Sequence, residues 1–287
     1  MQPVRIGDRV IGPGAPTFVV AEIGINHNGS VETACKLVHA AAAAGCDAVK
    51  FQKRTVDIVY SAEELARPRE SPFGTTNGDL KRGLEFGAAE YAEIDACCRT
   101  SNILWFASCW DEPSVDFMKP FDPPCWKIAS ASLTDTALLR HHRNMGKPIL
   151  ISTGMSSIEQ VAQALKTLQG EDVILLNCTS TYPTQLAEIN LRAIPRLQEH
   201  FGVPVGYSGH EVGLAPTLAA VALGACMVER HISLDRAMWG SDQAASVEPQ
   251  GFARLVKDIR AIEAAMGDGT KRVYESEIPI MQKLRRV

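Results

Sequence analysis

Polar side chains that could bind a small anion or a metal ion recur at the ends of apolar, β-branched runs in this sequence. The first run, 18–24, carries Glu22, and the second, 47–53, carries Lys50 and Gln52. Six later runs end in the same way. Their polar residues are Ser108, Lys127, Ser130, Ser152, Ser180, Tyr182, Ser208, His210, Glu229 and His231. Packing alone does not account for this repetition, because polar and charged side chains are seldom buried without partners.

Lys50 and Lys127 are the cations of this set, and four serines accompany them. An ammonium group attracts an anion as a point charge, and hydroxyl groups add hydrogen-bond donors. We therefore expect a site for a small dianion, such as a phosphorylated and carboxylated metabolite. Two alternatives stay open, since a single serine is more often a strand-end cap and a single lysine can form a structural salt bridge. The four serines are Ser108, Ser130, Ser152 and Ser208.

Two imidazoles, His210 and His231, follow the seventh and eighth runs. Imidazole is a common ligand of divalent metals, and Glu22 adds a carboxylate nearby. A lone histidine is more often a packed core residue, whereas two at neighbouring strand ends favour a metal site. Such a metal could polarise an aldehyde oxygen. His27 lies in the loop after the first run and could line the site or cap the first helix.

The elements that would position these residues alternate strictly between strand and helix. Such alternation implies a parallel sheet, and eight units within 287 residues predict one α/β domain, a (β/α)8 TIM barrel spanning 1–287. Active sites of such barrels lie at the carboxyl ends of the strands. No G-x-G-x-x-G motif follows the first run, which disfavours a dinucleotide-binding sheet. The expected strands are 18–24, 47–53, 103–108, 125–130, 148–153, 172–178, 204–208 and 226–232.

Two segments lie outside the repeat. Residues 3–14 predict a short N-terminal hairpin that closes the amino-terminal end of the barrel. Residues 54–88 form a long insertion after the second strand, on the side where active sites are built. We interpret the insertion as a substrate-covering loop with some helix. A flexible excursion without a role in binding is the alternative.

Charge and composition limit the possible partners. The 29 basic and 33 acidic residues give a net charge of −4, which argues against a dedicated nucleic-acid-binding protein. The N-terminus has no apolar signal region, and no run approaches the ~20 residues that span a bilayer. The eight cysteines form no C-x-x-C pair. We expect reduced thiols in a cytoplasmic protein that binds neither membrane nor nucleic acid.

Eight strings that contain these residues resemble the sialic acid synthase family. That family comprises the phosphoenolpyruvate-dependent N-acetylneuraminate and N-acetylneuraminate-9-phosphate synthases and their bacterial relatives, including spore-coat polysaccharide proteins. The strings occur in order over nearly the whole chain. They are 21-AEIGINHNG-29, 49-VKFQK-53, 127-KIAS-130, 152-STGM-155, 178-CTSTYP-183, 206-GYSGHE-211, 229-ERHISLD-235 and 240-GSDQAASVEP-249.

The resemblance implies a metal-dependent condensation of phosphoenolpyruvate with an aldose, giving a 2-keto-3-deoxy acid and phosphate in a homodimeric enzyme. His210 and His231 would bind Mn2+ or Mg2+, and Glu22 would transfer a proton or position water beside the metal. With Lys50 and Lys127, these are the expected catalytic residues. The residues implied around phosphoenolpyruvate are Lys50, Lys127, Ser130, Ser152, Ser180, Tyr182 and Ser208, and those implied for the acceptor are Gln52, Asn77 and Asp242.

The sequence departs from the family pattern in two places. Ser132 stands where the sugar synthases usually carry an acidic residue, and a serine cannot make the same charge-assisted hydrogen bonds to the acceptor. We also expect the chain to lack the C-terminal antifreeze-like domain that many members carry. Three interpretations therefore remain: a synthase with an unusual aldehyde, a synthase acting on N-acetylmannosamine or its 6-phosphate, and a non-catalytic barrel that binds a phosphorylated ligand.

Overall fold

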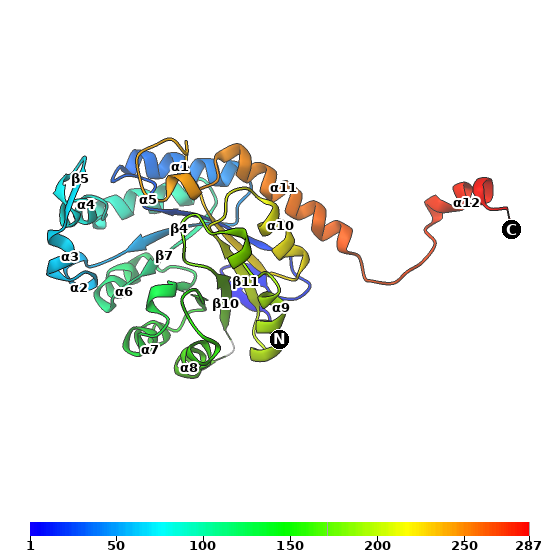
Figure 1. Cartoon of the computed structure of the whole chain (residues 1–287), viewed down its shortest axis with the longest axis horizontal. Helices are drawn as coiled ribbons and strands as arrows, with labels where there is room; N and C mark the ends of the chain where they lie inside the picture. Colours follow the sequence, from blue (N-terminus) through cyan, green and yellow to red (C-terminus); the bar gives the residue numbers. More distant parts are fainter. Residues whose placement is uncertain (171, 287) are drawn as a thin grey trace.

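Eight parallel strands close into a barrel in the order β10-β11-β12-β3-β4-β7-β8-β9, which confirms the predicted TIM barrel (Figure 1). The computed structural model describes residues 1–170 and 172–286, so the predicted domain limit at 287 lies outside them. Each predicted run contains one strand. The barrel strands are β3 (Phe18–Gly24), β4 (Ala48–Lys53), β7 (Leu104–Cys109), β8 (Trp126–Ile128), β9 (Ile149–Ser152), β10 (Val173–Cys178), β11 (Val205–Gly209) and β12 (Met227–His231).

Helices surround the barrel, and polar residues fix where several of them begin. The Ser30 hydroxyl accepts a hydrogen bond from the Thr33 amide, and the Asp135 carboxylate accepts one from the Leu138 amide. Both residues are N-caps, as their types predict. The helices are α1 (Val31–Ala43), α5 (Ala88–Thr100), α6 (Glu112–Met118), α7 (Thr136–Asn144), α8 (Ile158–Leu168), α9 (Ala193–Phe201), α10 (Ala215–Ala222) and α11 (Pro249–Met266). Short 3-10 turns are η1 (Lys119–Phe121), η2 (Ser130–Ser132), η3 (Leu186–Glu188) and η4 (Gln243–Ala245).

Alternation along the strands separates an inner core from the core beneath the helices. On β12, Met227 packs in the inner core and Val228 in the outer one. Because side chains alternate with a period of two, Glu229 and His231 share the inward direction of Met227. The inner core is apolar near the amino ends of the strands. Its members include Phe18, Val20, Ala48, Phe106, Cys125, Leu150, Ile174 and Leu176.

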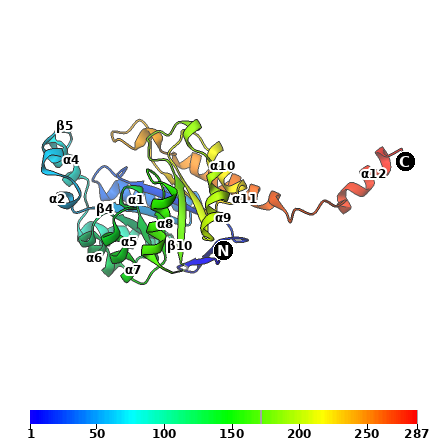
Figure 2. The same cartoon turned by 60° about the horizontal axis from the view of Figure 1, so that its bottom comes forward.

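The N-terminal hairpin closes the apolar end of the barrel, as predicted. Strands β1 (Val4–Ile6) and β2 (Arg9–Ile11) pair antiparallel, and Figure 2 shows them in dark blue below the barrel. Ile6 and Ile11 are fully buried and belong to the inner core. The hairpin therefore excludes water from the end of the barrel that carries no polar site.

The insertion after β4 is a small folded unit on the opposite side of the molecule. It contains the expected helix and also a β-hairpin that the sequence pattern did not predict. Most residues of that hairpin are exposed, so its strands lack the alternation of apolar and polar residues that indicates a strand. A capping box between Thr76 and Asp79 begins its last helix. Its elements are α2 (Val56–Val59), α3 (Ala62–Ala66), β5 (Pro68–Ser71), β6 (Gly74–Thr76) and α4 (Asn77–Gly83).

Beyond α11, the chain runs away from the barrel through η5 (Glu275–Glu277) and α12 (Ile278–Leu284), drawn in red in Figure 1. In the described part of the chain, none of the helices combines the length and apolar character needed to cross a membrane.

Mutation can test whether the N-terminal hairpin closes the inner core. Ile6→Ala removes most of a fully buried side chain and leaves a cavity at the base of the barrel. We expect a loss of about 2–5 kcal/mol in the free energy of unfolding, measured by urea titration. Val10→Ala, on the exposed face of the same hairpin, is the matched control and should change stability by less than about 0.5 kcal/mol. Equal effects would show that the hairpin does not close the core.

Candidate active site

The pairing of neighbouring strands lines up the predicted residues in two sets, because Lys50 pairs with Phe106 and it is Gln52 that pairs with Ser108. His231 on β12 pairs with Glu22 on β3, and Glu22 pairs with Lys50 on β4. Ser108 on β7 pairs with Lys127 on β8. Residues that are paired across parallel strands share a height and a facing direction. The strand register, rather than any loop, therefore gathers these groups.

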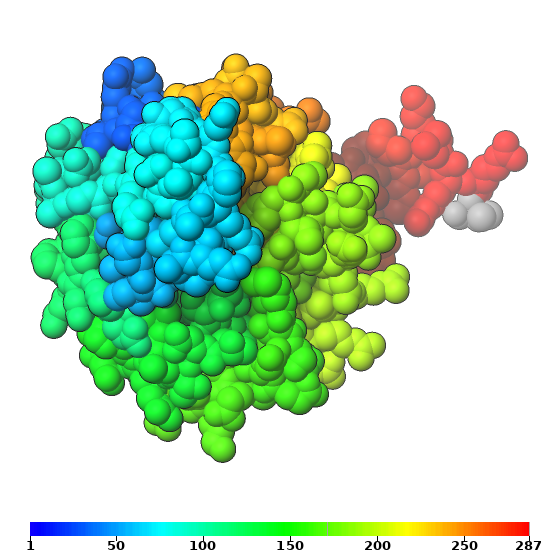
Figure 3. Space-filling view, turned by 60° about the vertical axis from the view of Figure 1, so that its left-hand side comes forward, coloured from blue at the N-terminus to red at the C-terminus, as the bar shows by residue number. Residues whose placement is uncertain are grey.

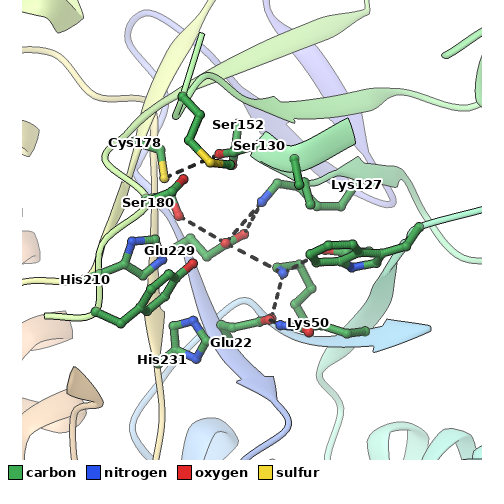
Figure 4. Close-up of a pocket in the computed structure, with 18 residues that line it drawn as sticks. Glu22, Lys50, Lys127, Ser130, Ser152, Cys178, Ser180, His210, Glu229 and His231 are labelled. Atoms are coloured by element: carbon green, nitrogen blue, oxygen red, sulfur yellow. Dashed lines mark hydrogen bonds and ion pairs between the residues drawn. The ribbon is translucent and has the colours of Figure 1, made fainter. Parts of the chain in front are cut away.

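These side chains line a cavity of about 210 Å³ at the carboxyl ends of the strands (Figure 4). All the residues predicted for the anion and the metal contribute to it, together with Gln52 from the acceptor set. The lining residues are Glu22, Lys50, Gln52, Ser108, Trp110, Lys127, Ala129, Ser130, Ala131, Ser152, Met155, Cys178, Ser180, Tyr182, Ser208, His210, Glu229 and His231.

The other three predicted acceptor residues lie outside this cavity lining. Asn77 is buried in the insertion, where it accepts a hydrogen bond from Arg69 and donates one to the backbone carbonyl of Glu64. Ser132 is buried in the turn that follows β8. Asp242 lies behind the metal-site imidazole, with its Oδ2 atom 3.8 Å from Nδ1 of His231. The cavity therefore contains all the residues predicted to bind the anion, but only Gln52 of those predicted to bind the acceptor.

Glu229 is the central carboxylate of the cavity. Its two oxygens accept hydrogen bonds from Nζ of Lys127 at 3.0 and 3.1 Å, and Ser208 donates to it at 3.2 Å. Nζ of Lys50 lies 3.7 Å from Glu229 Oε1 and 2.8 Å from Glu22 Oε2. The two ammonium groups and two carboxylates thus form one buried, charge-balanced network, visible as the dashed lines in Figure 4.

The two carboxyl groups differ in their affinity for protons. Burial would raise the pKa of Glu229, but Lys127 and Lys50 together outweigh it and hold that pKa at about 2. Burial raises the pKa of Glu22, and Lys50 offsets this only in part. Two carboxyl groups whose pKa values are pushed apart are typical of a site that needs one permanent charge and one proton carrier. Here the lowered pKa of Glu229 favours its charged form, and the raised pKa of Glu22 favours proton uptake.

Hydroxyl groups form the opposite wall of the cavity, where β8, β9 and β10 end. The amide of Gly154 donates a hydrogen bond to Ser130 Oγ at 3.1 Å, and the same hydroxyl lies 3.7 Å from the Cys178 thiol. A side chain at position 154 would collide with the hydroxyls of Ser130 and Ser180. The glycine therefore allows two loops to approach closely enough to place both hydroxyls in the cavity.

The two imidazoles fit a divalent metal with open coordination positions. Nδ1 of His210 lies 2.9 Å from the Thr179 carbonyl, which can only accept, so Nδ1 carries the proton and Nε2 keeps a free lone pair. Burial and the neighbouring His231 lower the pKa of His210 to about 4, which keeps that ring neutral. The two ring centroids are 5.5 Å apart. In the described residues, Nδ1 of His231 has no hydrogen-bond partner.

No group of three or more histidine, cysteine or acidic side chains in the described ranges 1–170 and 172–286 is arranged to hold a metal ion. If a metal is bound at this site, His210 and His231 would hold it, and water or substrate oxygens would complete the coordination. A site with few protein ligands and open positions is typical of metals that act in catalysis.

A second buried ion pair lies next to these histidines, formed by Arg230 on β12 and by Glu211, which follows the end of β11. Nη1 of Arg230 donates to Oε1 of Glu211 at 2.8 Å and to the Thr217 hydroxyl at 2.8 Å. The Tyr207 hydroxyl donates to the other carboxylate oxygen at 2.8 Å. Because Glu211 follows His210 and Arg230 precedes His231, this pair fixes the backbone that carries both imidazoles.

Sequence reasoning missed two features of the site and left one question open. Glu229 was noted at a strand end without a role, although its spacing of two from His231 already placed both on one face. Trp110 also lines the cavity, and no pattern marked it. His27 neither lines the cavity nor caps the first helix, because its ring is buried and stacks on Phe86 with centroids 4.1 Å apart.

Comparison with known proteins adds independent findings. Residues 37–271 match the model of the NeuB family. The N-acetylneuraminate-9-phosphate synthase of Homo sapiens is 39% identical over 282 residues, which are 96% of this chain and 78% of that protein. The N,N'-diacetyllegionaminic acid synthase of Legionella pneumophila is 35% identical over 286 residues, covering 96% of this chain and 80% of that protein. The crystal structure of an N-acetylneuraminic acid synthetase from Leptospira borgpetersenii in complex with citrate superimposes with a TM-score of 0.87 at 30% identity, covering 100% of this chain and 98% of that one.

The Arg230–Glu211 ion pair gives a prediction about the metal site. Arg230→Met leaves the buried Glu211 carboxylate without its cation, which should cost about 3–5 kcal/mol in the free energy of unfolding. Metal affinity should fall about 10- to 100-fold, because groups that support metal ligands typically contribute that much. Both effects can be measured by urea titration and by Mn2+ titration calorimetry.

The double variant Arg230→Met with Glu211→Gln should recover part of the stability, since it removes the unpaired charge. Arg254→Ala, at an exposed pair with Asp258 on α11, is the control and should change stability by less than about 1 kcal/mol. If Arg230→Met is as mild as the control, the pair has no supporting role.

Proposed function

Because this chain belongs to the NeuB family, whose synthases are phosphoenolpyruvate-dependent transferases that form carbon–carbon bonds, we propose that it condenses phosphoenolpyruvate with an aldose or another aldehyde. The products are a 2-keto-3-deoxy acid of the sialic acid type and inorganic phosphate. One observation carries the proposal: two buried lysines and two imidazoles face each other across a single small cavity. An anion site and a metal site that share one cavity suit two substrates that must react with each other.

The lysine side of the cavity would bind phosphoenolpyruvate. Each ammonium group has three donors. Lys127 donates to Glu229, whereas Lys50 donates to Ser108, lies 2.8 Å from Glu22 and lies 3.7 Å from Glu229. A phosphate or carboxylate entering the cavity would share these donors with Glu229 and add the hydroxyl groups of Ser130, Ser152 and Ser180. Ser108 already accepts a hydrogen bond from Lys50 at 2.9 Å, which orients that ammonium group. The network is therefore organised before the substrate arrives.

The histidine side would bind the aldehyde end of the acceptor. Mn2+ or Mg2+ held by His210 and His231 would supply a Lewis acid for the aldehyde oxygen. C3 of phosphoenolpyruvate bonds to the aldehyde carbon, water adds at C2, and the C2–O bond to phosphate breaks to leave the keto acid. Glu22 lies beside both halves, paired in register with His231 and 2.8 Å from Lys50. Its raised pKa suits it to carry the proton that these steps exchange.

The identity of the acceptor is less closely defined by the cavity than that of phosphoenolpyruvate. Gln52 lines the cavity, whereas Ser132 is buried in a turn and brings no carboxylate to the site. N-acetylmannosamine, its 6-phosphate and a different aldehyde all remain candidate acceptors. The non-catalytic alternative is disfavoured because a barrel that only binds a phosphorylated ligand does not require two free imidazoles opposite its lysines.

The anion side predicts a specific loss of binding. Lys127→Met should weaken phosphoenolpyruvate binding at least about 30-fold, because it removes a buried charged donor and leaves Glu229 with one cation fewer. Calorimetric titration measures the affinity, and urea titration measures the accompanying change in stability.

The double variant Lys127→Met with Glu229→Gln separates the two effects. Removing both charges should restore most of the stability without restoring phosphoenolpyruvate binding. Lys147→Ala, on the surface beside Asp122, is the control. Unchanged phosphoenolpyruvate affinity in Lys127→Met would contradict the assigned anion site.

A product screen tests the reaction itself. Phosphoenolpyruvate, Mn2+ and a panel of aldoses should give phosphate release together with a 2-keto-3-deoxy acid detected by mass spectrometry. His231→Ala should abolish release, because one of the two metal ligands is gone. If no aldehyde gives phosphate release and His231→Ala leaves ligand binding unchanged, the synthase assignment fails.

A further inference from the structure

Two of the eight cysteines meet on the outer side of the barrel, and neither lines the active-site cavity. Cys35 belongs to α1 and Cys97 to α5, 62 positions apart in the chain. The two helices pack side by side (Figure 1). Figure 3 shows this side of the molecule, with α5 in turquoise next to the cyan insertion. Both cysteines are free thiols, and both are partly exposed to water.

The Cys97 thiol contacts two groups of α1. Its Sγ atom lies 3.9 Å from the carbonyl oxygen of Cys35 and 3.5 Å from Nε2 of His39. His39 follows Cys35 by four residues, so the two side chains project from one face of the helix. The thiols of Cys35 and Cys97 also form a hydrogen bond with each other. Two thiols and one imidazole therefore form a single cluster between α1 and α5.

The two thiols of this cluster differ in their surroundings. Burial, the hydrogen bond to Cys97 and the negative charge that Cys97 can carry raise the pKa of Cys35 to about 12, and Glu93 adds to the effect. Cys35 therefore keeps its proton and can donate a hydrogen bond to a thiolate at Cys97. The base that could take the proton of Cys97 is His39, at hydrogen-bond distance from its sulfur. One thiol beside a base and a second that stays protonated suit attack by the first and resolution by the second.

The other six cysteines lack this combination. Cys178 lines the active-site cavity and contacts the Ser130 hydroxyl. The other five are buried, and burial raises the pKa of each thiol, which makes a cysteine unreactive. These five are Cys46, Cys98, Cys109, Cys125 and Cys226. An oxidant dissolved in water would therefore react first with the pair on the outer side of the barrel.

We propose that Cys35 and Cys97 are a peroxide-reactive pair that closes reversibly to a disulfide between α1 and α5. The Cys97 thiol gives its proton to His39, and the thiolate attacks one oxygen of hydrogen peroxide, whose O–O bond breaks. Cys97 becomes a sulfenic acid, and the other oxygen takes up the proton and leaves as water. The Cys35 thiol then attacks the Cys97 sulfur, and a second water leaves as the S–S bond forms. Two thiols are oxidised, and one peroxide is reduced to two waters.

The disulfide would close a loop that holds part of the active site. The segment between the two cysteines contains β4 and the whole insertion, and β4 carries Lys50 and Gln52 of the cavity. A cross-link over a long loop restricts the unfolded chain, so it stabilises the folded protein when the native geometry accommodates it. Oxidation therefore has a consequence that can be measured without any catalytic activity.

Peptide mapping by mass spectrometry tests the pair in the full chain. The reduced, folded protein is treated with hydrogen peroxide, alkylated and digested. We expect a cross-linked peptide that joins Cys35 to Cys97 and that dithiothreitol separates again. The thermal unfolding midpoint of the oxidised wild type should lie about 3 °C or more above that of the reduced protein. Cys97→Ser should show neither the cross-link nor the shift.

Further substitutions separate the roles of the three residues. Cys35→Ser should leave Cys97 as a sulfenic acid, which dimedone captures. His39→Gln should slow disulfide formation at least about tenfold, because an amide cannot take up the thiol proton. His200→Gln, at an exposed histidine of α9 that contacts Phe201, is the matched control and should leave the rate unchanged.

Several outcomes would overturn the thiol pair. They are the absence of the cross-linked peptide from oxidised wild type, a disulfide that joins two copies of the chain, and an unfolding midpoint that falls on oxidation. A rate in His39→Gln equal to that in His200→Gln would contradict the role of His39 as the base. None of these measurements involves phosphoenolpyruvate, so their results are independent of the proposed condensation.

Discussion

One buried carboxylate, Glu229, organises the centre of this barrel. Two lysines inside a protein repel each other and lose their hydration, so neither can stay charged there without a compensating anion. Glu229 contacts both ammonium groups, and Glu22 contacts one of them. The cavity can therefore hold two cations ready for an anionic substrate while its own net charge stays close to zero.

A second charge pair lies next to the imidazoles. Arg230 on β12 and Glu211 just after β11 are as buried as the groups inside the barrel, and Arg230 donates to Thr217 on α10. Because side chains alternate along β12, each inward group of the site has an outward neighbour that anchors the strand. The His210 ring is thus positioned by its hydrogen bond to the Thr179 carbonyl and by the Arg230–Glu211 pair next to it.

The two halves of the site differ in how they are built. The anion half is made from side chains on barrel strands and the first residues after them, which the closed sheet holds rigidly. The insertion and the loop after β12 contact each other through side chains such as Phe73 and Trp239. Loops of this kind can vary while groups on the barrel strands are preserved.

Local patterns in the sequence determined the eight strands, the N-terminal hairpin and the polar residues at the strand ends. These features depend on nearby residues, and the sequence alone was enough to predict them. Strand register and loop packing join residues far apart in the chain, so only the tertiary structure decided them. It made Glu229 the partner of Lys127, 102 positions away, and buried Asn77 behind Arg69 rather than at the acceptor. It also folded the insertion around a hairpin that has no apolar pattern in the sequence to reveal it.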